Sequence, residues 1–254
     1  MGLVSSGGLR DVMKLYKSIF RVDFPLCFGI IDRLGKYSDF LHKTTQRLPF
    51  VDAKSEVNLV NNTLANSGRV DNDHYRFGLT ITSLDAVTEH TDGVEVGELA
   101  KHPVFEVGDA MRDELKGDIG TVYERVGLRV WILVEEPSFS FEGIRDALRA
   151  NLPQLDGPVS KAFPKPKDLA IVFEATNEHD VDARVACGPY RSSEYEKYFK
   201  KEPALREGLV LDIDFSERKV DIPGFRFSRF AARSEAQMLS VVGGITTSLR
   251  ARDS

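Results

Sequence analysis

The chain carries Glu124-Arg125-Val126-Gly127-Leu128-Arg129-Val130 in its middle and Leu209-Val210-Leu211-Asp212-Ile213-Asp214-Phe215 near its end, and these two stretches decide the fold. Side chains of a β-strand alternate between two faces, so each stretch has one apolar face and one charged face. The charged face holds two arginines in the first stretch and two aspartates in the second. If the two strands are neighbours in a sheet, we expect the arginines to face the aspartates.

The rest of the chain predicts further strands and helices on both sides of these stretches. Apolar residues at three- and four-residue spacings over 9–20 predict a short helix, and the unbroken apolar run at 24–31 predicts a buried strand. Short alternating segments separated by turn residues over 55–90 predict an antiparallel meander. The other predicted elements are helices over 36–48, 95–116, 144–152 and 234–249, and strands over 169–173, 181–187 and 208–216.

Strands occur in runs with helices between them, and they do not alternate strictly with helices. This pattern favours an α+β fold with mostly antiparallel sheets. We expect two lobes of helix-grip type, with long helices packed across curved sheets. The expected boundaries are an N-terminal tail and helix at 1–21, a first lobe at 22–136 and a second lobe at 137–254. Three identities between residues 75–80 and 124–129 leave open whether the lobes are duplicated.

Composition indicates a globular protein of the cytoplasm. With 42% hydrophobic residues among 254, the chain can bury a sizeable core, and its formal net charge of -5 provides no general attraction to nucleic acid or anionic membranes. Two distant cysteines cannot form a disulfide framework, and the sequence has no apolar run of the roughly 18 residues that span a membrane. Gly2 and Ser6 match the loose pattern for myristoylation, but a flexible tail is the favoured interpretation.

The compact motifs of the large enzyme classes are missing from the sequence. It contains no phosphate-binding P-loop, no dinucleotide-binding glycine motif, no His-Glu-x-x-His, no Cys-x-x-Cys and no Gly-x-Ser-x-Gly. The histidines are His42, His74, His90, His102 and His179, and no two of them have the spacing of metal ligands. We therefore expect no cofactor.

The candidate site consists of the charged residues of the two deciding strands, Arg125, Arg129, Asp212 and Asp214. One interpretation is a structural charge network, or the lining of a pocket. The alternative is a metal site, because two carboxylates at positions i and i+2 of a strand point the same way and can share a divalent cation. A nucleotidyltransferase would also need a glycine-serine turn upstream that holds phosphate, and no such turn is evident.

Two further segments could contact partners. Tyr190, Tyr195, Tyr198 and Phe199 suit a partner or ligand surface, and their alternative is a helix packed by its own aromatic residues. The basic loop with Lys161, Lys165 and Lys167 could contact a nucleic-acid backbone. Three lysines in such a loop are more often a solvated linker, so we favour a protein partner or a homo-oligomer, without nucleic acid and without a membrane.

The chain resembles a sporadically distributed family of uncharacterised bacterial proteins. The resemblance rests on Arg125-Val126-Gly127-Leu128-Arg129 and on Leu211-Asp212-Ile213-Asp214, and it would cover roughly residues 22–250. The chain departs from the family at Val130-Trp131-Ile132, where the family tends to have an aromatic residue and an asparagine. The resemblance implies an α+β fold and a bacterial cytoplasmic setting, and it carries no activity.

These features predict a non-catalytic binding or assembly protein, such as a subunit of a bacterial defence- or phage-related complex. The missing catalytic motifs and the scattered histidines carry this prediction. The alternative is a metal-dependent enzyme that acts on nucleotides or nucleic acid through Asp212 and Asp214.

Overall fold

The computed structural model describes residues 13–150, 167–199 and 201–250. In chain order its elements are β1 (Met13–Asp23), α2 (Gly29–Thr45), β2 (Phe50–Asn58), β3 (Thr63–Val70), β4 (Asp73–Leu79), β5 (Ser83–Glu95), η1 (Val96–Lys101), α3 (Pro103–Leu115), β6 (Val122–Val134), α4 (Phe141–Ala150), β7 (Ile171–Thr176), β8 (Asp182–Arg191), η2 (Ser192–Lys197), β9 (Glu207–Asp221) and α6 (Phe227–Arg250).

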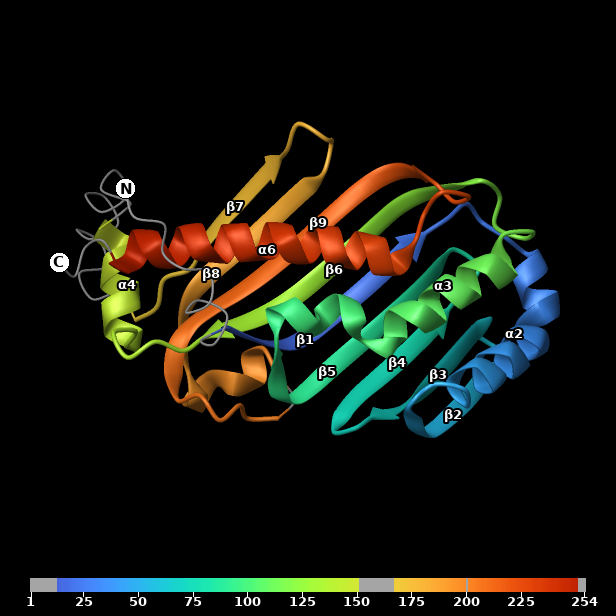
Figure 1. Ribbon diagram of the computed structural model, residues 1–254, viewed down its shortest axis with the longest axis horizontal. Helices are drawn as coiled ribbons and strands as arrows, with labels where there is room; N and C mark the ends of the chain where they lie inside the picture. The colour runs from blue at the N-terminus through green and yellow to red at the C-terminus, as the bar shows by residue number, and fades with distance from the viewer. Residues whose placement is uncertain (1–12, 151–166, 200, 251–254) are drawn as a thin grey trace.

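All nine described strands pair in one sheet, in the order β2-β3-β4-β5-β1-β6-β9-β8-β7 (Figure 1). Every pairing is antiparallel. The expected architecture of two lobes is therefore wrong, although helices and strands are both present as an α+β protein requires. β1 and β6 pair along their length and join the strands of the two chain halves. This pairing cannot be predicted from the separate periodicities of the two segments.

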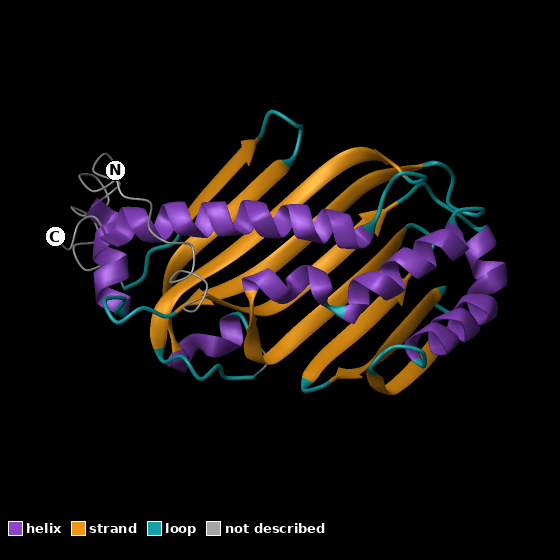
Figure 2. Cartoon of the chain, in the orientation of Figure 1, coloured by secondary structure: helices purple, strands orange, loops and turns teal. Residues whose placement is uncertain are grey.

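The helices α3 and α6 lie across the same face of the sheet (Figure 2). The main hydrophobic core fills the space between them and the sheet, and alternate residues of β6 and β9 enter it, as the strand periodicity predicts. A smaller cluster of Tyr16, Leu133, Tyr190, Leu205 and Val210 packs separately. Its members Leu133 on β6 and Val210 on β9 have the opposite parity to the core residues of those strands. The expectation of long helices is wrong for most of the chain, because α3 and α4 have 13 and 10 residues, and α6 alone among the described helices reaches 24.

The predicted helix at 9–20 is wrong over its described part, because these residues belong to β1. A β-bulge shifts the register between Leu15 and Lys17, so Tyr16 is an extra residue in the strand. Met13 and Leu15 lie on the helix-covered face before the bulge, and Phe20 and Val22 lie there after it. The inserted residue lengthens the spacing between buried residues of β1 from two to three at this point. A spacing of three is also typical of the buried face of a helix.

The predicted buried strand at 24–31 is also wrong, since α2 begins at Gly29. Leu26 and Phe28 are exposed, so the apolar run does not enter the core as a unit. Buried residues recur at helical spacing beyond it, at Ile30, Leu34 and Tyr37. By contrast, the antiparallel meander and the strands at 124–130 and 208–216 are confirmed.

Candidate functional site

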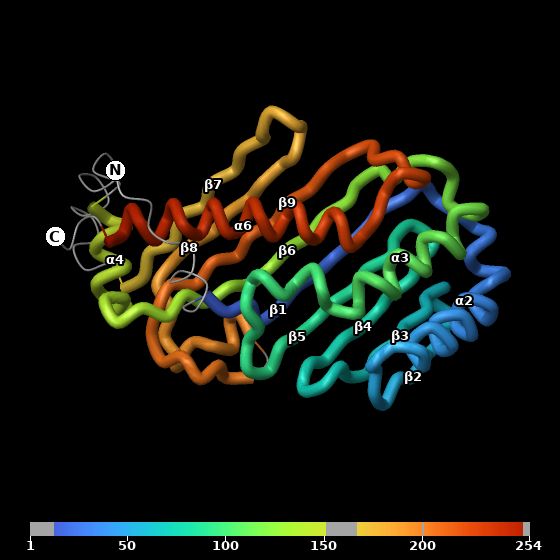
Figure 3. The backbone as a smooth tube through the Cα atoms, viewed as in Figure 1, coloured from blue at the N-terminus to red at the C-terminus, as the bar shows by residue number. Residues whose placement is uncertain are grey.

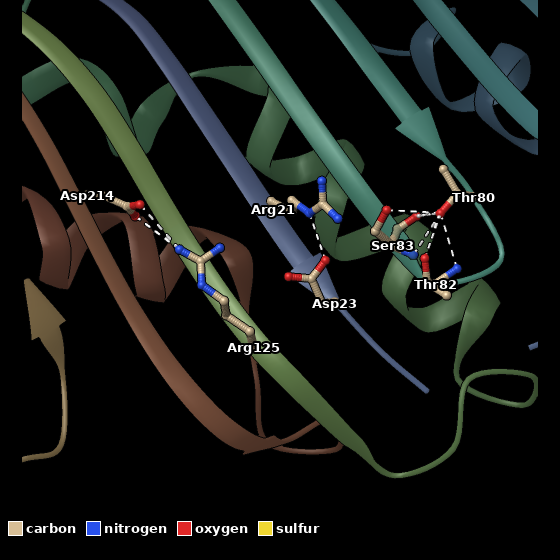
Figure 4. A network of polar contacts seen from close by, with 7 residues as sticks. All are labelled: Arg21, Asp23, Thr80, Thr82, Ser83, Arg125 and Asp214. Atoms are coloured by element: carbon tan, nitrogen blue, oxygen red, sulfur yellow. Dashed lines mark hydrogen bonds and ion pairs between the residues drawn. The ribbon is translucent and has the colours of Figure 1, made fainter. Parts of the chain in front are cut away.

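The face of the sheet opposite α3 and α6 carries charged side chains on its central strands, and we call it the open face. Figure 4 shows this face, with side chains from β1, β6 and β9 in front of the helices. Neighbouring strands place these residues in rows, because Arg129 on β6 is paired in register with Asp214 on β9, and Asp214 with Arg184 on β8. The antiparallel register therefore gathers charges that lie far apart in the sequence.

The four candidate residues from the two deciding strands form two ion pairs on this face. Arg129 donates from Nε and Nη2 to the two carboxylate oxygens of Asp212, at 2.8 and 2.6 Å. Arg125 donates from Nη2 to both oxygens of Asp214, each at 3.3 Å. Both ion pairs are diagonal, since Arg129 lies directly opposite Asp214 in the register. The structure thus brings together all four residues that the sequence singles out.

Gly127 makes space for these arginines. A Cβ atom at this position would lie 3.0 Å from the Nη1 and Nη2 atoms of Arg125, so the guanidinium passes over the glycine. Gly78 plays the same part on β4, where a Cβ atom would lie 2.5 Å from an Oδ1 atom of Asp85. The similarity between residues 75–80 and 124–129 thus has a physical reason, because both glycines leave room for a charged side chain on the open face.

Burial and charge act in opposite directions on the acidic groups of the open face. Burial raises the pKa of Asp214, and the positive charges of Arg125 and Arg129 offset part of that rise. Hydrogen bonding to Asp212 raises the pKa of the Arg129 guanidinium. Each of the two carboxylates has both of its oxygens hydrogen-bonded to a guanidinium. The metal alternative for Asp212 and Asp214 would therefore have to displace two arginines.

The four aromatic residues singled out at the end of β8 and beyond it pack against the sheet and each other. Tyr190 is buried. Phe199 lies 5.3 Å from the ring of Tyr16, and Tyr195 and Tyr198 are half-buried beside the smaller cluster. Of the lysines in the basic loop, Lys167 is exposed. Lys161, Lys165 and Gly2 lie outside the described residues.

The structure also groups Asp73, His90 and His102, which the sequence does not suggest. Their potential metal-ligand atoms lie within 4.8 Å of one another. His90 contacts Asp73 through Nδ1 at 2.5 Å and Thr88 through Nε2 at 3.3 Å. Pairing across β4 and β5, and the start of α3, bring these residues together, so no local spacing of histidines reveals the group.

His102 serves as the cap of α3, and this role conflicts with metal binding. Its Nδ1 accepts a hydrogen bond from the backbone N–H of Val104 at 3.2 Å. The neutral ring then carries its proton on Nε2, so that nitrogen has no lone pair for a metal. Burial, followed by the charge of His90, lowers the pKa of His102 to about 4. His102 is therefore a neutral capping residue beside an Asp73–His90 pair, and its protonated Nε2 is buried without a hydrogen-bond partner among the described residues.

The edge strand β7 exposes apolar side chains. Val172 is 49% exposed and Phe173 is 55% exposed. Beside them lies an apolar cavity of about 270 Å³. Its lining includes Leu148, Ile171, Phe173, Cys187, Ile245 and Leu249. The sequence predicts the strand, but its position at the edge follows from the strand order alone.

No family model, curated protein or solved structure matches this chain. Among the described helices, none combines the length and the apolar character that crossing a bilayer requires.

Proposed function

We propose that the protein is a non-catalytic assembly protein that binds a second copy of itself through the edge strand β7. The observation that carries the proposal is the exposure of Val172 and Phe173 on an edge with which no other described strand pairs. Soluble proteins rarely leave such an edge open, because its free N–H and C=O groups can pair with another chain.

The two edges of the sheet differ in their protection. The edge strand β2 has a register shift between Val51 and Lys54, and Asp52 lies there in a left-handed conformation with φ of 56°. Bulges and lysines of this kind discourage pairing between sheet edges. The pairing of β7 with β8 is regular over all six residues, and β7 contains neither lysine nor proline. Among the described strands, β7 is therefore the edge suited to association.

Charge is compatible with a second copy at this edge. Glu174 is the single charged residue of β7, and Arg184 on β8 lies 3.5 Å from its carboxylate. If two copies pair antiparallel about a two-fold axis that passes beside Phe173, this residue faces Phe173 of the other copy, and Glu174 of one copy faces Val172 of the other. No like charges then lie directly opposite each other, and the two sheets continue as one. A two-fold pairing of identical surfaces is the commonest form of homo-oligomer.

The test is the mass of the full-length protein in solution, measured by light scattering after size exclusion over a range of concentrations. We expect a dimer that Phe173→Glu dissociates, because the two new glutamates would face each other. Phe173→Lys should dissociate the dimer in the same way. A mixture of the two variants should associate again, since glutamate would then face lysine, and this rescue is specific to the two-fold pairing.

Val60→Glu is the matched control. Val60 is 90% exposed in the turn between β2 and β3, so it is an apolar residue away from β7 that is even more accessible than Phe173. We expect this variant to remain dimeric, with circular dichroism confirming that all variants are folded. A wild-type monomer at every concentration would overturn the proposal, as would equal dissociation of the Val60 and Phe173 variants.

A further inference from the structure

The end of α3 and the start of α6 lie at the same end of the sheet (Figure 3). A polar cavity of about 390 Å³ is lined by residues of both segments. Arg112, Lys116 and Arg226 line it together with the single carboxylate of Asp113. The other lining groups come from the loops that precede β6 and α6. Three cations and one anion give these walls an excess of two positive charges, although the chain as a whole has a formal charge of -5.

Arg112 and Lys116 lie four residues apart at the C-terminal end of α3, so they project from the same side of the helix. Asp113 accepts hydrogen bonds from both arginines, from Nη2 of Arg112 at 2.5 Å and from Nη1 of Arg226 at 3.3 Å. Lys116 forms no ion pair with another described residue. The single carboxylate therefore leaves the positive charge of the cavity uncompensated.

Arg112 has a donor without an acceptor inside the protein. The residue is 2% exposed, and its Nη1 donates to the backbone oxygen of Phe225. Its Nε is buried and has no hydrogen-bond partner among the described residues. Buried polar groups are almost always paired, because an unpaired donor loses its hydration without compensation. A guanidinium with a free donor in the wall of a cavity is therefore prepared for an acceptor.

A second buried group without a hydrogen-bond partner among the described residues is the hydroxyl of Tyr123. Burial raises the pKa of Tyr123, and the charge of Arg112 acts against that rise. Tyr123 belongs to the main core and does not line the cavity. The unpaired Nε of Arg112 and the three cations of the lining therefore indicate a ligand with several acceptor oxygens.

The start of α6 borders the cavity. Pro223 and Arg226 line the cavity, and α6 begins at the next residue, Phe227. Asp109 accepts from the backbone N–H of Phe227 and from the hydroxyl of Ser228, so it caps the first turn. This carboxylate offsets the helix dipole, so the positive charge of the cavity comes from its three cationic side chains.

We infer that this cavity binds a phosphate group. Guanidinium groups match the oxygen geometry of phosphate, and phosphate can accept from donors that approach from several directions, as they do here. A carboxylate has two oxygens and would leave part of the donor set unpaired. The site is separate from β7, so it does not depend on self-association.

The test uses inorganic phosphate as the probe on the full-length protein, with binding followed by titration calorimetry and by the shift in melting temperature. Chloride at equal ionic strength controls for electrostatic screening, and acetate tests whether a carboxylate binds as well as phosphate does. We expect phosphate to bind and to raise the melting temperature above both other salts. Glycerol phosphate tests whether a phosphate ester binds. Binding of this ester without binding of inorganic phosphate would show that the site recognises the phosphate group of a larger ligand.

The variants are Lys116→Gln and Arg226→Gln, because both side chains lie in the more accessible part of the cavity and Arg112 is too deeply buried to replace safely. We expect each variant to weaken phosphate binding by at least about tenfold, as loss of a charged hydrogen bond does. Lys43→Gln, at an exposed lysine in the last turn of α2, is the matched control and should bind like the wild type. Binding of neither phosphate compound, equal binding of acetate, or an equal loss in the Lys43 variant would overturn the inference.

Discussion

Arg129 holds Asp212 through two hydrogen bonds while its guanidinium lies 4.6 Å from the ring centre of Trp131. Lys17 approaches the same ring at 5.1 Å. The tryptophan therefore supports two cations on the open face, and cation–π contacts of this kind contribute to stability. At the scale of the residue, the open face consists of paired charged side chains that pack over Trp131 and Gly127.

Replacing Asp212 measures how much its ion pair with Arg129 contributes to the free energy of unfolding. Its side chain is 17% exposed and that of Arg129 is 42% exposed, so Arg129 stays partly hydrated when its partner is lost. We expect Asp212→Asn to lower the free energy of unfolding by about 1 to 2 kcal/mol, between the values typical of surface pairs and of buried pairs. Urea unfolding measures the change.

Asp23→Asn serves as the comparison for Asp212→Asn, because Asp23 pairs with Arg21 on the same face and that arginine is about half exposed. Its cost should stay below about 1 kcal/mol. A loss above about 3 kcal/mol for Asp212→Asn would contradict the half-buried character of the pair. No difference between the two variants would show that the contact with Trp131 and the two hydrogen bonds add nothing.

At the scale of the elements, α3 and α6 meet at a glycine. A Cβ atom at Gly108 on α3 would lie 2.6 Å from the ring of Phe227 on α6. That ring packs against Phe20 and Phe225, with ring centres 4.4 and 5.3 Å away. The close approach of the helices therefore depends on the missing side chain, and it also positions the start of α6 beside the basic cavity.

Gly108→Ala should lower the free energy of unfolding by about 1 to 3 kcal/mol, because the methyl group must displace a buried aromatic ring. Thermal and urea unfolding measure the change. Gly35→Ala on α2 is the matched control, since no atom lies within 4 Å of its Cβ position. There alanine should raise stability by up to about 1 kcal/mol through its helix propensity. Equal effects at the two glycines would show that the contact with Phe227 is not required.

At the scale of the whole molecule, a single sheet joins the two halves of the chain. Strand β1 pairs with both β5 and β6, so the centre of the sheet contains residues from the start and the middle of the sequence. Neither half can keep its central strand pairing without the other. Stability is then a property of the whole sheet, and we expect the molecule to unfold as one unit.

Equilibrium unfolding should therefore show one transition at the same midpoint by tryptophan fluorescence and by far-ultraviolet circular dichroism. Trp131 is the single tryptophan of the chain and lies on the central strand β6, so its fluorescence reports the centre of the sheet. Circular dichroism reports all helices and strands together. Two separated midpoints would contradict one cooperative sheet and would indicate halves that unfold independently.

Several elements follow from the sequence because their information is local. Alternation over 124–130 and 209–215 predicts two strands with charged faces, and the structure places those strands side by side. Turn residues predict the meander, whereas the helix predicted over 95–116 is divided into η1 and α3, and α3 begins at Pro103. Even here local periodicity has a limit, since the bulge at Tyr16 makes a strand resemble a helix.

By itself, the sequence determined which segments are strands with one charged face, because side-chain alternation is a property of each segment alone. Only the tertiary structure decided that all these strands share one sheet, that β7 is an edge, and that Arg112, Lys116 and Arg226 surround one cavity. The reason is physical. Strand pairing uses backbone groups that every residue carries, so a strand does not specify its neighbour until the hydrophobic faces of distant segments pack together.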